Sequence, residues 1–103
     1  MRAWWLLCLC MPAWAQEPGP GLGRALAATC ATCHGTDGRA VGSALPSLAG
    51  IKAETLLERL TDYRSGRLPG TVMPQITRGY TEAQLQLIAA YFAAQPPAPR
   101  ARP

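Results

Sequence analysis

The chain has 103 residues, of which 49% are hydrophobic and 16% are charged, with a formal net charge of +4. This length is typical of a single domain. So small a positive charge gives no support for a nucleic-acid partner or for binding to a membrane surface.

The first 15 residues have the features of a secretory signal peptide. Arg2 is a small basic start, residues 3–11 are mostly apolar, and residues 13–15 (Ala-Trp-Ala) form a small-x-small cleavage site. We expect residues 1–15 to be cleaved, with Cys8 and Cys10 leaving in the leader. A retained anchor is the weaker alternative, because the apolar run is shorter than the roughly 18 residues that span a bilayer. We therefore expect no stable membrane insertion after cleavage.

A first helix is expected after a loose arm rich in Pro and Gly at residues 16–21. The stretch from Leu22 to Thr32 is compatible with a helix, because Leu22, Leu26 and either Thr29 or Cys30 recur at helical spacing. The last turn of this helix leads into the pentapeptide Cys-Ala-Thr-Cys-His at residues 30–34.

Cys-x-x-Cys-His is the attachment signature of a c-type haem. Cysteines three residues apart lie on one face of a helical turn, where both sulfurs can reach the vinyl groups along one porphyrin edge. The next residue, His34, then brings its imidazole to the iron as the proximal ligand. His34 is the only histidine, and Cys30 and Cys33 are the only cysteines after residue 10. We therefore expect one covalently bound haem c.

Three other uses of this pentapeptide fit less well. A closed zinc site needs four ligands, and the chain offers three after residue 10. A thioredoxin-like pair is typical of a βαβ setting, which the sequence does not indicate. A disulfide between Cys30 and Cys33 would leave His34 unexplained.

The middle of the chain predicts one helix between two loops. Residues 35–50 are rich in Gly and irregular, and Asp37 there is expected to form a turn rather than to act in acid–base chemistry. A second helix is expected from Ala53 to Arg64, with Gly66 as its stop. Residues 68–80 contain two prolines and two glycines, so we expect a loop that includes one helical turn.

Met73 lies in this second loop and is the only methionine after residue 11. A lone methionine is often a core gap-filler, but one beside Pro74 in a loop is poorly placed for that role. A thioether is a soft ligand that favours ferrous iron, so ligation by His34 and Met73 would raise the reduction potential. Two protein ligands leave no open position for a substrate, which favours electron transfer over catalysis at the iron.

The last helix is the best defined. Thr81 and Gln84 form a predicted capping box at its start, and two prolines at 96–97 end it. Four apolar residues line one of its faces: Leu85, Ile88, Ala89 and Phe92. Residues 96–103 are a Pro-rich basic tail that we expect to be extended and mobile. Because no stretch alternates in the strand pattern, the predicted class is all-α with three main helices.

With these features residues 22–95 resemble the class I cytochromes c. The resemblance implies a small domain at residues 16–95, with its helices wrapped around one covalent haem. In that family a proline carbonyl accepts a hydrogen bond from the ring of the proximal histidine, and Pro46 stands in the matching position. The first and last helices of the family also cross through a small residue and an aromatic one. The candidates here are Gly23 or Ala27 with Tyr91 or Phe92.

The chain is also similar to the haem subunit of flavocytochrome c sulfide dehydrogenase. Four stretches carry this likeness: Tyr63-Arg64-Ser65-Gly66, Thr71-Val72-Met73, Arg78-Gly79-Tyr80-Thr81 and Ala90 to Gln95. The two-haem cytochromes c4 share some of these elements, and the run from Arg78 to Tyr80 favours the sulfide enzyme. Many such subunits carry two haem domains. This sequence stops at the Pro-rich tail, where a second haem domain would begin, so we expect a single-haem version.

The resemblance implies an electron-transfer subunit that is not catalytic by itself. A separate FAD-containing flavoprotein would oxidise sulfide, and this chain would pass the electrons to a soluble acceptor such as another cytochrome. The compartment would be the periplasm, because bacteria attach c-type haem outside the cytoplasm. Tyr63, Arg64 and Arg67 are candidate contacts for the haem propionates. Two alternatives stay open. One is a free monohaem carrier that delivers electrons to an oxidase, and the other is a haem sensor or peroxidase in which Met73 dissociates from the iron.

Overall fold

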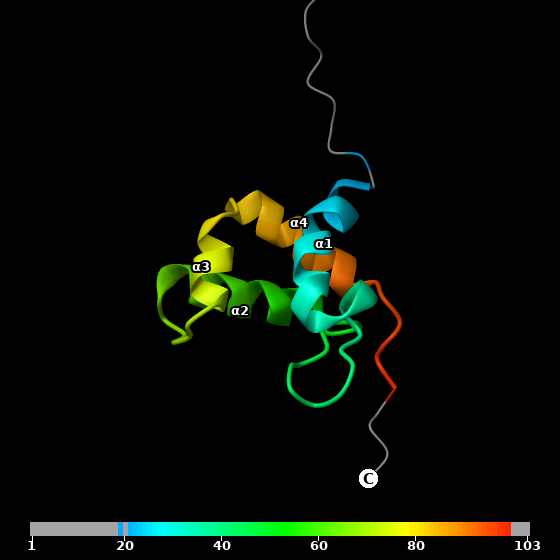
Figure 1. Ribbon diagram of the computed structural model, residues 1–103. Coiled ribbons are helices and arrows are strands. Elements are labelled where there is room, and N and C mark those ends of the chain that lie inside the picture. The colour runs from blue at the N-terminus through cyan, green and yellow to red at the C-terminus, as the bar shows by residue number, and fades with distance from the viewer. Residues whose placement is uncertain (1–18, 20, 100–103) are drawn as a thin grey trace, which may run out of the picture.

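The structure is a computed structural model, and it describes residue 19 and residues 21–99. Regular elements in these residues are all helical: α1 (Gly21–His34), the 3₁₀ turn η1 (Thr36–Gly38), α2 (Ala53–Ser65), α3 (Met73–Arg78) and α4 (Glu82–Ala93). α1 packs against α4, and α2 packs against both α4 and α3 (Figure 1). The all-α class predicted from the sequence is confirmed.

The helix ends follow local signals in the sequence. α1 extends as far as His34, so it contains the whole Cys-x-x-Cys-His pentapeptide. α2 stops where Gly66 adopts a left-handed conformation with φ of 81°, as expected of a C-terminal glycine. α3 occupies part of the stretch where a loop with one helical turn was expected. Pro74 is tolerated there because it lies in the first turn, where its missing N–H breaks no helical bond.

The start of α4 is held by the predicted capping box. The backbone N–H of Gln84 donates to Oγ1 of Thr81 at 3.2 Å, and the backbone N–H of Thr81 donates to Oε1 of Gln84 at 2.9 Å. Two of the backbone donors that a helix start leaves without partners are thereby satisfied. The position of α4 along the chain is therefore determined by its own sequence.

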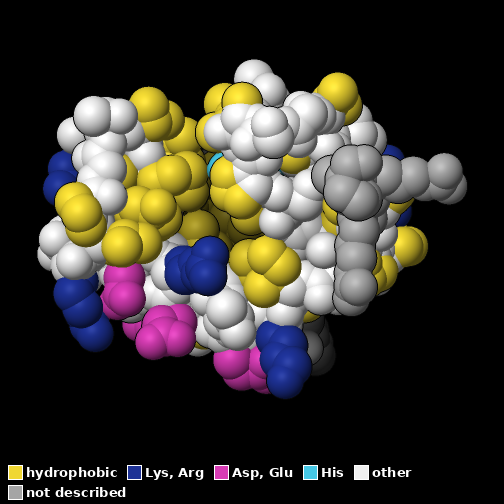
Figure 2. All heavy atoms as spheres, turned by 90° about the horizontal axis from the view of Figure 1, so that it is seen from below, with side chains coloured by type: hydrophobic (Ala, Val, Ile, Leu, Met, Phe, Trp, Pro, Cys, Tyr) yellow, Lys and Arg dark blue, Asp and Glu magenta, His cyan; other side chains and the backbone are white. Residues whose placement is uncertain are grey.

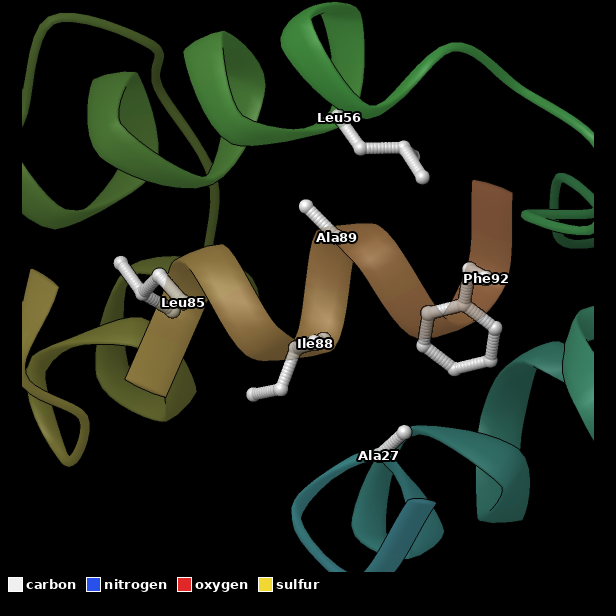
Figure 3. Close-up of a cluster of buried hydrophobic side chains, with 6 residues drawn as sticks. All are labelled: Ala27, Leu56, Leu85, Ile88, Ala89 and Phe92. Carbon is white, nitrogen blue, oxygen red and sulfur yellow. The ribbon is translucent and has the colours of Figure 1, made fainter. Parts of the chain in front are cut away.

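α4 supplies most of the hydrophobic core. Its four inward side chains, predicted from helical spacing, are Leu85, Ile88, Ala89 and Phe92, and each is 1–2% exposed. Figure 3 shows them between Leu56 of α2 on one side and Ala27 of α1 on the other. α4 is thus the element on which the other main helices are assembled.

The crossing of α1 and α4 uses both small residues that the sequence offered. A Cβ atom added to Gly23 would lie 3.0 Å from the carbonyl oxygen of Leu87 and 3.6 Å from Cβ of Tyr91. One turn later, Ala27 is buried and points towards the ring of Phe92 (Figure 3). Gly23 therefore lies against Tyr91, and Ala27 lies against Phe92.

The long loop between α1 and α2 folds back onto the end of α4. The carbonyl oxygen of Gly38 accepts hydrogen bonds from the N–H groups of Leu48 (2.7 Å) and Ala49 (3.1 Å). The N–H of Gly50 donates to the carbonyl oxygen of Phe92 at 2.9 Å. These bonds hold the two halves of the loop together and bring its middle, which contains Pro46, close to the end of α1.

The predicted leader at residues 1–15 and the last four residues of the predicted tail lie outside the described residues. Within the described part of the tail, the carbonyl oxygen of Pro96 accepts a hydrogen bond from Nε of Arg39 at 3.3 Å. Across residues 19 and 21–99, no helix combines the length and the apolar character that a membrane crossing requires.

Candidate haem-binding site

His34 is the last residue of α1, and its side chain is only 8% exposed. Its ring atom Nδ1 lies 2.7 Å from the carbonyl oxygen of Pro46. A carbonyl oxygen can only accept, so Nδ1 carries the proton and Nε2 keeps its lone pair. In the neutral ring this contact favours the tautomer that can bind a metal through Nε2, and it fixes the orientation of the imidazole.

The two residues directly after Pro46 are each held by a hydrogen bond. The hydroxyl oxygen of Ser47 accepts a hydrogen bond from the N–H of Ala40 at 3.0 Å. The N–H of Leu48 donates to Gly38, as described above. The carbonyl group that faces His34 thus belongs to a segment tied to the turn directly after the pentapeptide, which makes it a fixed acceptor.

The two cysteines lie in the last turns of α1 with free thiols, Cys30 half-buried and Cys33 exposed. Burial raises the pKa of the Cys30 thiol, and the nearby Cys33 acts in the same direction. Reactive cysteines of disulfide oxidoreductases instead have a lowered pKa, which makes them thiolates near neutral pH. The pKa of Cys30 is thus shifted in the opposite direction from that of a reactive thioredoxin-like cysteine.

A hollow opens beside the end of α1. Figure 2 shows it from below, between the side of the molecule that carries α3 and the side that carries the end of α1, with hydrophobic side chains on both walls. Histidine, of which the chain has one, is visible inside the hollow. Two thiols one helical turn apart, an imidazole with a free Nε2 and apolar walls are the groups that a covalently attached haem needs. The residues present fit haem c.

Met73 is the first residue of α3 and is half-buried. It lies on a different element from the pentapeptide, and α3 and α1 stand on opposite sides of the molecule in Figure 1. Of the three candidate propionate contacts, Arg67 forms an ion pair with Asp62 at 3.3 Å. Tyr63 is half-buried and Arg64 is exposed, both near the end of α2.

The reasoning from sequence missed one polar residue near this region, Thr77, and it missed one contact of Asp37. Thr77 of α3 is buried and bonds to the backbone of Met73; a threonine four residues after a candidate ligand was the available signal. Asp37 lies in the expected turn, with φ of 53°, and also accepts a hydrogen bond from the hydroxyl of Tyr91. That bond raises the pKa of Tyr91. No local signal connects residues 37 and 91, because they meet only through the packing of α4 on the turn.

Comparison with known proteins gives matches over most of the described chain. The family model described as cytochrome c matches residues 21–95. The cytochrome subunit of sulfide dehydrogenase from Chlorobaculum tepidum is 41% identical over 70 residues, which are 68% of this chain and 63% of that protein. A cytochrome c4 from Pseudomonas aeruginosa is 37% identical over 73 residues, or 71% of this chain and 36% of that protein.

A solved structure shares the same fold. Thiosulfate dehydrogenase from Marichromatium purpuratum aligns with a TM-score of 0.70 and 29% sequence identity, over 82% of this chain and 20% of that one. The present chain therefore spans less than two thirds of the length of each of these three relatives.

Proposed function

Because this chain belongs to the cytochrome c family and so carries haem c, we propose that it is the electron-transfer subunit of a flavocytochrome c sulfide dehydrogenase. A separate FAD-containing subunit oxidises sulfide, and this chain accepts the electrons and passes them to a soluble acceptor such as another cytochrome. The observation that carries the choice of enzyme is the 41% identity to a subunit of that name. The proposed compartment is the periplasm.

Each residue of the site has a distinct part in this proposal. Cys30 and Cys33 would hold the haem through thioether bonds, and His34 would bind its iron through Nε2. Pro46 keeps the imidazole in one orientation through its 2.7 Å contact with Nδ1. Met73 of α3 would be the second protein ligand of the iron. The haem supplies a centre that gains or loses one electron.

Two protein ligands explain why this chain would carry electrons rather than transform a substrate. With His34 and Met73 both bound, no position at the iron is free for a reactant. The imidazole is held by a backbone carbonyl, so its orientation need not change when the iron changes its charge. A thioether favours the ferrous state, which makes the centre a good acceptor for electrons from a flavin.

A free carrier is the second candidate function. The 37% identity to a cytochrome c4 supports it. The same residues would hold the haem in that case, and the difference would lie in the partner: a diffusing cytochrome delivers electrons to an oxidase and forms no lasting complex with a flavoprotein.

Purification of the native chain from its host distinguishes the two candidates. We expect a flavin band beside the c-haem bands at equal amounts, and we expect sulfide to bleach the flavin and reduce the haem. A haem spectrum without flavoprotein, together with no reduction by sulfide, would contradict the dehydrogenase subunit and favour the free carrier.

The axial ligands are tested separately in the holoprotein. Met73→Leu keeps an apolar side chain of similar size but removes the thioether. We expect this variant to lose the absorption band of thioether-bound ferric haem and to bind carbon monoxide in the ferrous state. The wild type should keep the band and should not bind carbon monoxide. Ready carbon monoxide binding by the wild type would instead indicate a sensor or peroxidase.

A further inference from the structure

We propose that Thr77 is a positioning residue for Met73: its buried hydroxyl holds the backbone from which Met73 reaches the iron. Thr77 thereby determines how firmly the thioether keeps its place. This inference rests on the proposed role of Met73 as the second axial ligand.

α3 has little stability of its own. It contains six residues, and Val72 before it offers no side-chain hydrogen bond to cap it. Helices shorter than about 12 residues are marginal without tertiary support. Met73 therefore begins a helix whose position depends on its packing against α2 and on its few internal bonds.

Thr77 supplies one of those bonds from inside the protein. Its side chain is 1% exposed, and Oγ1 donates to the carbonyl oxygen of Met73 at 2.9 Å. The carbonyl oxygen of Pro74 lies farther away, at 3.3 Å. Since a hydroxyl has one proton, the shorter contact to Met73 is the main bond.

Burial couples this bond to the place of Met73. A buried hydroxyl without a hydrogen-bond partner destabilises the folded state. The alternative acceptor for Thr77, the carbonyl oxygen of Pro74, lies in the same first turn of α3 as Met73. Displacement of that turn would leave the hydroxyl without a partner. The backbone of Met73 is therefore held to a buried side chain.

Two substitutions separate the hydroxyl from the packing of Thr77. Thr77→Val keeps the size and branching of the side chain but removes the donor. Thr77→Ser keeps the donor and removes the methyl group. Ile88→Val in α4 is the matched control, because it removes a buried methyl group from the core on a different helix.

The measurement is the affinity of imidazole for the ferric holoprotein, since imidazole competes with the thioether for the iron. We expect Thr77→Val to bind imidazole about fivefold more tightly, the factor that corresponds to one lost hydrogen bond. Thr77→Ser and Ile88→Val should bind it with the affinity of the wild type. Denaturant unfolding of the same proteins shows whether the effect follows global stability.

The outcomes separate this inference from the one on which it rests. A wild-type protein without the band of thioether-bound ferric haem would overturn both. With that band present, equal imidazole affinity in Thr77→Val and the wild type would overturn the role of Thr77 and leave Met73 as the ligand. An effect in Thr77→Ser but not in Thr77→Val would show that packing acts instead of the hydroxyl.

Discussion

Gly38 and Gly42 lie in the same loop with similar left-handed backbones, but only Gly38 is crowded. Their φ angles are 80° and 77°. A Cβ atom on Gly38 would lie 2.7 Å from Cδ1 of Phe92 and 2.9 Å from the backbone nitrogen of Ala49, whereas one on Gly42 would meet nothing within 4 Å. The missing side chain at Gly38 is what lets the loop that carries Pro46 lie directly on α4.

The pair Gly38→Ala and Gly42→Ala tests this at the scale of single residues. Both substitutions place a Cβ atom in a left-handed conformation, which costs about 1–2 kcal/mol. Gly38→Ala should lower the free energy of unfolding by roughly a further 1–3 kcal/mol, because the new Cβ atom is forced against the ring of Phe92 and the backbone of Ala49. Urea unfolding of the two holoproteins measures the difference, and equal losses would show that the crowding has no energetic effect.

The hydrogen bond from Tyr91 to Asp37 predicts a dependence of stability on pH. It raises the pKa of Tyr91 above its ordinary value of about 10. The stabilisation is therefore complete below about pH 10 and disappears as the pH rises through the higher pKa of the folded state. Tyr91→Phe should lower the free energy of unfolding by about 1 kcal/mol at pH 7 and should lose less stability than the wild type above pH 10.

Urea midpoints between about pH 7 and pH 11 measure this effect, since both sides of the tyrosine pKa are then covered. Tyr80→Phe is the control, because the described residues contain no hydrogen bond from the Tyr80 hydroxyl. The explanation fails if both variants and the wild type lose stability equally with rising pH.

At the scale of elements, the crossing of α1 and α4 depends on the absence of a side chain at Gly23. A Cβ atom added there would lie 3.0 Å from a backbone oxygen of α4, so the larger Val side chain must push the helices apart. We expect Gly23→Val to lose about 2 kcal/mol or more of unfolding free energy. A Cβ atom added to Gly21 in the same helix would meet nothing within 4 Å, so Gly21→Val should lose far less unfolding free energy. Similar thermal midpoints for the two variants would contradict a close crossing.

At the scale of the whole molecule, the protein core alone is small. The described residues contain seven buried hydrophobic side chains, and three of them are alanines. A chain of this length buries little surface and usually needs an additional stabilising element. In the proposed site the haem would fill the apolar hollow and complete the core, so folding and haem attachment should depend on each other.

Removal of the covalent haem tests this dependence. The double variant Cys30→Ala, Cys33→Ala leaves His34 and Met73 in place but cannot form thioether bonds. We expect it to unfold at a lower denaturant concentration and with a broader transition than the holoprotein, as followed by circular dichroism. The single variant Cys33→Ala, which keeps one attachment point, should be intermediate. An unchanged midpoint in the double variant would show that the helices do not need the bound haem.

Features that depend on neighbours along the chain could be predicted from the residues alone. The capping box of α4, the glycine stop after α2 and the all-α class follow from residues a few positions apart, because helix formation is local. The Cys-x-x-Cys-His motif is also a local feature, since one helical turn brings its side chains together. The role of Met73 was inferred from its uniqueness and stays a prediction.

Contacts between residues far apart in the chain are seen only in the packed fold. Gly23 lies against Tyr91 while Ala27 lies against Phe92, and the sequence could not choose between these pairs. The bond between Asp37 and Tyr91 joins residues that are 54 positions apart in the chain. The physical reason is that such contacts depend on the crossing and rotation of packed helices, which arise from the fit of all the buried side chains together rather than from any local pattern.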